Sequence, residues 1–269
     1  MRKFEQDYAS LISRILLTGE ERETRNGMTK SLFGLNLTVP VGESLFPMLQ
    51  GRKMWVNGPI GEYAAMIRKP KHLDDFRKWG CNYWELWAKP DNSIDIDYGN
   101  AWFDFNGVDQ IADLKDKLAN NPTDRRMIVN GWRPDRLNTV DLPCCHYSYQ
   151  FYVRGGKHLD ILWNQRSVDM MVGLPSDIIF AAAWLIALAR EFDLTPGFIY
   201  MSLGDCHVYG NHIDSAEAYL DFVSDAEQQA PITYHYEAPV GFDSCKFEPD
   251  MLKLLNLPDA PRLHLELNA

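Results

Sequence analysis

The stretch HYSYQFYVRGGKHLDILWNQRSVDMMVGLPSDIIFAAAWLIALA, residues 146–189, decides the fold. It opens with two runs rich in aromatic and branched residues, 146–153 and 158–164, and a Gly-Gly turn separates them, which predicts two strands of one sheet. It ends with a continuous apolar run, 178–189, which is shorter than the roughly 20 residues that a bilayer span needs. We therefore predict a buried core helix here, with Ser176 as its N-terminal cap.

The segments on either side continue the alternation of helices and strands. Amphipathic spacing predicts helices, aromatic and branched runs predict strands, and a charged stretch predicts a loop. Because no linker, repeat or low-complexity segment interrupts the chain, we expect one α+β domain over residues 1–269 with a mixed, mainly antiparallel sheet and a long buried central helix. The predicted helices are 3–17, 58–68, 71–79, 108–119 and the one that ends near Phe192, the further strands are 31–39, 127–132 and 198–202, and the loop is 21–30.

The composition is that of an ordinary globular protein. Of 269 residues, 46% are apolar, 12% aromatic and 24% charged, which excludes a disordered, collagen-like or coiled-coil chain. The 27 Lys and Arg residues against 37 Asp and Glu residues give a net charge of −10, which disfavours broad binding to a nucleic-acid backbone. An anionic ligand must therefore meet a local cluster of arginines.

The five cysteines do not follow a disulfide or zinc pattern. Their number is odd and no C-x-x-C pair occurs, which argues against a disulfide scaffold and a structural metal site. Charged and polar residues interrupt the N-terminal apolar positions, so a signal peptide is not expected. We expect a cytoplasmic protein that uses no metal and contacts no membrane.

Two Cys-His pairs, Cys145-His146 and Cys206-His207, are candidates for nucleophilic chemistry. A nucleophilic cysteine must be a thiolate, which a neighbouring histidine or positive charge stabilises. By itself such a pair is more often two core residues of a strand, and both interpretations stay open.

Arginines and isolated carboxylates supply further candidates. Arg125 and Arg126 follow a turn, and Arg166 ends a predicted strand; guanidinium forks match phosphate geometry, although adjacent arginines are also common on solvated faces. Glu62 and Asp177 lie in apolar surroundings, and a buried carboxylate is costly unless it is paired or functional. For Asp177, helix capping remains an alternative.

Seven motifs occur in order along residues 24–214. They are TRNGMTKSLFG (24–34), YWELWA (83–88), DYGNAW (97–102), TDRRMIV (123–129), LPCCHYSYQFYV (142–153), NQRSVDMMVGLPSDI (164–178) and LGDCHVYGNHID (203–214). In content and order they resemble the thymidylate synthase family of pyrimidine carbon-5 transferases. The resemblance implies a thymidylate synthase-like fold, a homodimer with shared active sites, and 5,10-methylenetetrahydrofolate as the carbon donor.

The resemblance also implies roles for single residues. Cys145 corresponds to the nucleophile that adds to carbon 6 of the pyrimidine, and a shift by one residue stays open because Cys144 stands where the family usually has proline. Arg125 and Arg126 correspond to the pair that the family contributes from the other subunit. The remaining implied roles are proton handling by Glu62, Tyr98 and His146, phosphate binding by Arg25, Arg166 and Ser167, sugar binding by His207 and Tyr209, base binding by Asp177 and Asn211, and folate binding by Asp169, Trp84 and Gly173.

Asp177 departs from the thymidylate synthases, which have asparagine at this position. An asparagine amide donates to O4 of uracil and accepts from its N3–H, whereas an ionised aspartate can only accept. Facing cytosine, aspartate accepts from the N4 amino group and stabilises a proton on N3, which makes carbon 6 more electrophilic. A misplaced buried acceptor costs about 1–3 kcal/mol, so Asp177 favours cytosine, and the deoxycytidylate hydroxymethylases of this family also carry aspartate here.

Ser176 is a second departure, because the family commonly has a phenylalanine there that packs on the folate. A small polar residue beside the reacting carbon admits water, which we expect Glu62 to orient, and water then completes the reaction in place of hydride. We therefore expect a folate-dependent dCMP 5-hydroxymethyltransferase, as a virus that modifies its DNA would use. The segment 263–269 does not clearly match the closing tail of the family.

Several alternatives stay open. A dCMP 5-methyltransferase, a thymidylate synthase acting on dUMP and a CMP 5-hydroxymethylase fit the same motifs. A cysteine hydrolase using Cys145 with His207 belongs to another class and leaves the arginines and Asp177 unexplained. A non-catalytic nucleotide- or RNA-binding module is a further alternative.

Overall fold

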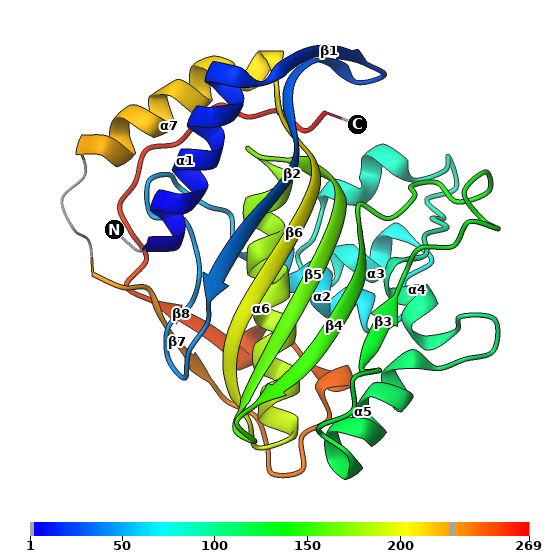
Figure 1. Ribbon diagram of the computed structural model, residues 1–269. Coiled ribbons are helices and arrows are strands. Elements are labelled where there is room, and N and C mark those ends of the chain that lie inside the picture. The colour runs from blue at the N-terminus through cyan, green and yellow to red at the C-terminus, as the bar shows by residue number, and fades with distance from the viewer. Residues whose placement is uncertain (1–2, 226–229, 269) are drawn as a thin grey trace.

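The computed structural model describes residues 3–225 and 230–268, and a six-stranded sheet forms its centre (Figure 1). The strand order is β1-β2-β6-β5-β4-β3, and every neighbouring pair is antiparallel except β5 and β6, which run parallel. The mixed, mainly antiparallel sheet is therefore as predicted. The strands are β1 Glu20–Thr24, β2 Gly27–Pro40, β3 Ile128–Asn130, β4 His146–Arg154, β5 His158–Asp169 and β6 Thr195–Tyr209.

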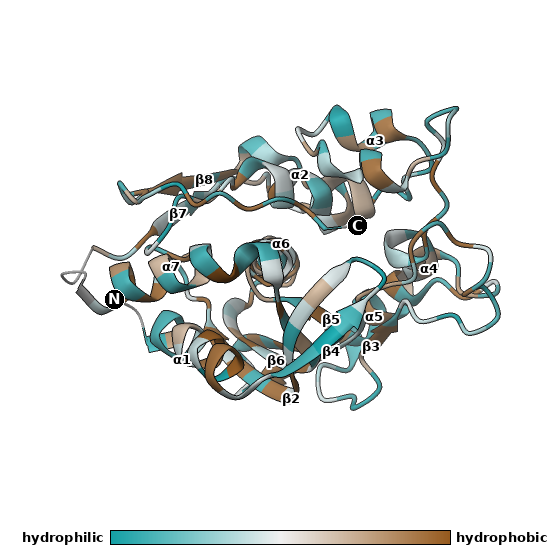
Figure 2. Cartoon of the chain, turned by 90° about the horizontal axis from the view of Figure 1, so that it is seen from above, coloured by the Kyte–Doolittle hydropathy of each residue, from teal (hydrophilic) through white to brown (hydrophobic). Residues whose placement is uncertain are grey.

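The helix α6, Gly173–Glu191, connects β5 to β6 and lies at the centre of the core. Figure 2 shows it between the sheet and a layer that contains α2, Asn57–Met66, and the β7–β8 hairpin, Thr233–Tyr236 with Leu252–Leu255. Among residues 3–225 and 230–268 it is the single helix long and apolar enough to cross a membrane, and 78% of that apolar window is buried inside the fold. The predicted buried core helix is confirmed.

The remaining elements surround this centre. Amphipathic helices pack their apolar sides on the core, as Phe4, Tyr8 and Ile12 of the first helix do. These helices are α1 Lys3–Thr18, α3 Leu73–Arg77, α4 Tyr98–Phe103, α5 Gln110–Asn120 and α7 Ile213–Asp225, and the short 3-10 helices are η1 Tyr83–Trp87, η2 Gly210–His212, η3 Ser244–Lys246 and η4 Pro249–Met251.

Three local predictions are wrong. The segment 21–30 is not a loop, because β1 pairs with β2 and leaves only a short turn; β1 is exposed and charged along its whole length, so it carries no apolar alternation. The helix predicted at 71–79 is shorter, Leu73–Arg77. Ser176 does not cap α6, because the helix begins at Gly173 and the Ser176 hydroxyl donates to the carbonyl oxygen of Val172 at 3.0 Å.

The parallel pair β5 and β6 brings polar residues from two distant segments to one edge of the sheet. Ser167 pairs with Asp205, and Asp169 pairs with His207. At Gly204, a Cβ atom would lie 2.7 Å from the carbonyl oxygen of Arg166, so only glycine lets β6 approach β5 this closely. The turn between β1 and β2 covers the same edge, because Thr29 pairs with Tyr209.

Candidate active site

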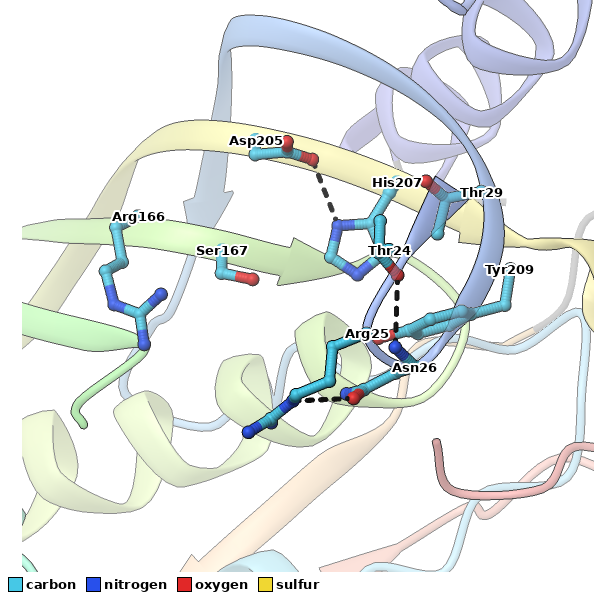
Figure 3. A pocket seen from close by; sticks show the side chains of 9 residues that line it. All are labelled: Thr24, Arg25, Asn26, Thr29, Arg166, Ser167, Asp205, His207 and Tyr209. Carbon is cyan, nitrogen blue, oxygen red and sulfur yellow. Dashed lines mark hydrogen bonds and ion pairs between the residues drawn. The ribbon is translucent and has the colours of Figure 1, made fainter. Parts of the chain in front are cut away.

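A polar pocket of about 270 Å³ opens where the carboxyl ends of β5 and β6 meet the β1–β2 turn (Figure 3). Two guanidinium groups, a histidine and a tyrosine reach it from three different strands or turns, which suits an anionic, hydroxylated ligand. The lining residues are Thr24, Arg25, Asn26, Thr29, Arg166, Ser167, Asp205, His207 and Tyr209.

The turn that carries Arg25 is held by its own side chains. The Thr24 hydroxyl donates to the carbonyl oxygen of Gly27 at 2.7 Å, and Arg25 Nε donates to Asn26 Oδ1 at 3.0 Å. Figure 3 shows the guanidinium groups of Arg25 and Arg166 on one side of the pocket and Tyr209 on the other. The resemblance implies that the side with the two arginines receives the phosphate and that the side with Tyr209 receives the sugar.

Asp205 orients His207 and is itself paired with Arg22. Its Nδ1 lies 3.2 Å from Asp205 Oδ1, and the other oxygen of Asp205 accepts from Arg22 at 2.9 Å. The hydrogen bond from His207 lowers the pKa of Asp205. With Nδ1 directed at this carboxylate, Nε2 of His207 is the ring nitrogen that can meet a ligand hydroxyl, beside the edge-on ring of Tyr209.

Arg166 also braces the loop that carries the two adjacent cysteines. Its Nε donates to the carbonyl oxygen of Cys144 at 2.8 Å, and its terminal nitrogen donates to that of Pro143 at 2.9 Å. The same guanidinium thus lines the pocket and holds the loop. Arg166 would therefore position both a phosphate bound in the pocket and the candidate nucleophile Cys145.

Cys145 is the accessible cysteine of the pair. It is half-buried, whereas Cys144 is 2% exposed and directs its thiol at the carbonyl oxygen of Gly131. The backbone N–H of Cys145 donates to the Tyr98 hydroxyl at 2.7 Å. Burial raises the pKa of the Cys145 thiol, and the Arg166 charge and a hydrogen bond with Tyr98 act in the opposite direction. The geometry favours the Cys145 register over Cys144.

Gln165, which the sequence analysis missed, holds Asp177 in place. Trp163 Nε1 can only donate, so the Gln165 side-chain atom 3.1 Å from it must be the amide oxygen, Oε1. The Gln165 amide nitrogen, Nε2, therefore faces Asp177. Nε2 donates to Asp177 Oδ2 at 2.7 Å and to the carbonyl oxygen of Ser167 at 3.2 Å. The position of Gln165 beside Arg166 in the NQRS motif was the one indication in the sequence that Gln165 belongs to the site.

With Gln165 donating to Oδ2, Oδ1 is the oxygen that can hold a proton. Burial, reinforced by the charge of Glu62, raises the pKa of Asp177 to about 8. This shift favours the neutral carboxyl group over the ionised carboxylate expected from the sequence. Its position in the first turns of α6, with its carboxyl group turned to Gln165, also excludes the capping alternative.

His146 presents a lone pair to Asp177. The Tyr149 hydroxyl donates to the His146 carbonyl oxygen at 3.0 Å, so its oxygen accepts from His146 Nδ1 at 2.6 Å. The unprotonated Nε2 then lies 3.8 Å from Asp177 Oδ1. Burial lowers the pKa of His146 to about 3, so this imidazole is a neutral acceptor.

Glu62 is the second buried carboxyl group of the site. Trp84 Nε1 donates to its Oε1 at 2.8 Å, and the Tyr83 hydroxyl donates to its Oε2 at 2.5 Å. Burial raises the pKa of Glu62 to about 7, while both hydrogen bonds lower it. Tyr83 is a further residue that the sequence analysis missed, although it lies inside the YWELWA motif.

Two of the three residues with an implied folate role, Asp169 and Gly173, lie where β5 passes into α6. Asp169 Oδ1 accepts from the backbone N–H groups of Met171 and Val172 at 2.9 and 3.1 Å. A Cβ at Gly173 would lie 3.5 Å from the Asp169 Cβ and 4.0 Å from Asp177 Oδ2. Trp84 is buried with its N–H on Glu62.

Three residues with implied roles lie outside this pocket. Arg125 and Arg126 are exposed beside β3, and Arg126 pairs with Asp124 at 2.7 Å. Asn211 is exposed on η2, where its amide and that of Asn268 exchange hydrogen bonds at 3.3 and 3.4 Å. In the described chain, no group of three or more His, Cys, Asp or Glu side chains could hold a metal ion.

The sequence profile of the family described as thymidylate synthase matches residues 6–264. The chain belongs to the thymidylate synthase family. It is therefore an enzyme of folate-dependent one-carbon transfer to carbon 5 of a pyrimidine nucleotide, and its α+β fold with a buried central helix is the one predicted. Members of this family use methylenetetrahydrofolate.

Proposed function

We propose that this enzyme is a dCMP 5-hydroxymethyltransferase, built as one catalytic domain over residues 1–269. The observation that carries the choice of base is the half-buried Asp177, whose Oδ2 accepts from Gln165 and whose pKa is raised to about 8, so that its proton would lie on Oδ1. Cytosine presents an N3 lone pair and an N4 amino group, which match an O–H donor and a carboxyl acceptor.

Cytosine can also take the proton, which uracil cannot do at N3. Transfer from Asp177 to N3 creates a carboxylate beside a protonated base, and such charge-assisted hydrogen bonds are about twice as strong as neutral ones. A neutral carboxyl group can still bind uracil, but only through neutral hydrogen bonds. The protonated N3 withdraws electrons from carbon 6, so the contact both selects and activates the base.

The residues around Cys145 serve the carbon-bond steps. The thiolate adds to carbon 6, and carbon 5 becomes the nucleophile that receives the one-carbon unit. Methylenetetrahydrofolate supplies this unit at the oxidation level of formaldehyde. Carbon 5 then loses its proton while the bond between the one-carbon unit and the folate nitrogen breaks, so tetrahydrofolate leaves. An exocyclic methylene group remains on a pyrimidine still bound to Cys145.

Glu62 is our candidate base for the water that adds to this methylene group. The oxygen of water bonds to the exocyclic carbon, its proton passes to Glu62, and the bond between sulfur and carbon 6 breaks. One dCMP, one methylenetetrahydrofolate and one water give one 5-hydroxymethyl-dCMP and one tetrahydrofolate, and no hydride is consumed. Ser176, small and half-buried in the first turn of α6, supports access of water.

A homodimer with shared sites completes the proposal. Tyr200 and Leu162 pair on the outer face of the sheet and are 39% and 38% exposed, which is unusual for large apolar residues at the centre of a sheet. Gln150, paired with Leu162, donates to the carbonyl oxygen of Arg125 at 3.1 Å. Arg125 and Arg126 thus lie beside this face, which supports the proposal that they bind a partner's phosphate.

Two further proposals concern surroundings and substrate. The five cysteines are free, which supports a cytoplasmic enzyme, in the host cell if it is viral. The substrate is a free nucleotide and not a nucleic acid, because the net charge of −10 disfavours binding to a nucleic-acid backbone while Arg25 and Arg166 supply local positive charge in the pocket.

The test offers dCMP, dUMP and CMP, each tritiated at carbon 5, in pairwise competition with methylenetetrahydrofolate. We expect fastest tritium release from dCMP and a product whose mass corresponds to added hydroxymethyl. Faster release from dUMP would refute the choice of base, and dihydrofolate formed in step with dCMP consumption would identify a methyltransferase. Failure of 5-fluoro-dCMP to form a covalent complex with the enzyme and folate would favour a binding module.

A further inference from the structure

The Tyr83 hydroxyl donates a hydrogen bond to one oxygen of the Glu62 carboxyl group, and this contact joins two separate segments. Glu62 lies on α2, and Tyr83 begins η1 21 residues later. The hydroxyl donates to Oε2 at 2.5 Å while Trp84 donates to Oε1 at 2.8 Å, so each carboxylate oxygen has one protein donor. Because a carboxylate oxygen accepts about two hydrogen bonds, one acceptor site remains on each for a water or the base.

The Tyr83 ring is held independently of its hydroxyl. Its ring packs edge-on against Trp55 with centroids 5.9 Å apart, and the hydroxyl also contacts Cys81. Removal of the oxygen alone therefore leaves the ring in its packing while Glu62 loses its second donor.

The hydroxyl favours the charged form of Glu62. A hydrogen bond donated to a carboxylate stabilises the ionised state, and here it opposes the desolvation that raises the pKa of Glu62 to about 7. The titratable groups that interact with Glu62 are Cys81 and Tyr83 beside η1, Tyr149 on β4 and Asp177 on α6. Of these, Tyr83 donates a hydrogen bond to the carboxyl group directly.

We propose that Tyr83 is a positioning residue that holds Glu62 as the ionised base for the water-adding step. This inference rests on the proposed function, in which water completes the reaction. By donating to Oε2, Tyr83 fixes the plane of the carboxyl group, so that the remaining acceptor sites keep one direction relative to the substrate.

The test compares Tyr83→Phe with the unchanged enzyme and with Tyr236→Phe, which removes a buried hydroxyl that makes no hydrogen bond within the described structure. For Tyr83→Phe we expect kcat to fall about tenfold, with KM for dCMP unchanged. The acidic limb of the kcat profile should move up by about one pH unit, because Glu62 loses a donor to its charged form.

A pre-steady-state measurement separates the water step from earlier steps. If only water addition slows, Tyr83→Phe releases one tritium from carbon 5 per active site in a fast phase and then turns over slowly. Covalent complex formation with 5-fluoro-dCMP should stay at the rate of the unchanged enzyme.

A double-mutant comparison distinguishes the proposed effect of Tyr83 on Glu62 from a general loss of folded protein. In a Glu62→Gln background, Tyr83→Phe should have no further effect on kcat, since it acts through the Glu62 charge. Unchanged kcat and pH profile in Tyr83→Phe, or full additivity with Glu62→Gln, overturns the role of Tyr83. Absence of any hydroxymethyl product from the unchanged enzyme instead overturns the proposed function.

Discussion

Asp177→Asn exchanges a carboxyl group that can give a proton to the base for an amide that cannot. Gln165 is held by Trp163 and Ser167, so its Nε2 continues to donate, and the new side chain must turn its oxygen toward Gln165. The amide NH₂ then takes the place of Oδ1. The shape of the site is kept and the transferable proton is lost.

The magnitude follows from the burial of this group. Burial raises the pKa of Asp177 from 3.8 to about 8, so the empty site disfavours the charged carboxylate by roughly 6 kcal/mol. Only a cation beside it, such as protonated cytosine, offsets this cost. Replacing the charge-assisted hydrogen bonds by neutral ones should weaken transition-state binding of dCMP by about 1–3 kcal/mol, which is about 5- to 150-fold in kcat/KM. The ratio of kcat/KM for dUMP to that for dCMP should therefore rise.

The assay is competition between dCMP and dUMP tritiated at carbon 5, read as the ratio of the two kcat/KM values. Asp193→Asn, an exposed aspartate after the far end of α6, is the matched control and should leave the ratio unchanged. In the unchanged enzyme kcat/KM for dCMP should fall above about pH 8, where Asp177 loses its proton, and Asp177→Asn should lack this limb. An unchanged ratio in the variant refutes the reasoning.

Three further predictions concern the nucleophile, the stability and the dimer. Cys145→Ala should abolish turnover while Cys144→Ala retains it; an inactive Cys144→Ala with an active Cys145→Ala would shift the register by one residue. The folded state binds the Asp177 proton more tightly than the unfolded chain, so ionisation of this group lowers the free energy of unfolding as pH rises from about 4 to about 8. The Asp177→Asn variant should therefore melt several degrees above the unchanged enzyme at pH 9 and at the same temperature at pH 4. Equal melting temperatures of the two proteins at both pH values would contradict the burial argument. Mixing inactive Cys145→Ala with an inactive Arg125→Ala/Arg126→Ala variant should restore activity through mixed dimers, whereas continued inactivity would place the arginines in their own subunit's site.

Much of the fold could be predicted because local sequence dictates it. The run 178–189 is apolar on every side, so it can only be buried, and 146–153 and 158–164 carry the aromatic and branched residues of strands. The β1 strand escaped prediction because an exposed, charged edge strand carries no apolar alternation. Its existence depends on pairing with β2, which local sequence does not encode.

For the candidate site, too, some features follow from the sequence and others only from the tertiary structure. By itself the sequence determined which residue types were available, through the seven ordered motifs, the adjacent pair Cys144 and Cys145, and the aspartate at position 177. Only the tertiary structure decided that α6 begins at Gly173, that Gln165 pins one oxygen of Asp177 and that Tyr83 reaches Glu62. The protonation of Asp177 follows from desolvation by neighbours far away in the sequence. Packing sets it, because a pKa depends on the water and charges that surround a group in space.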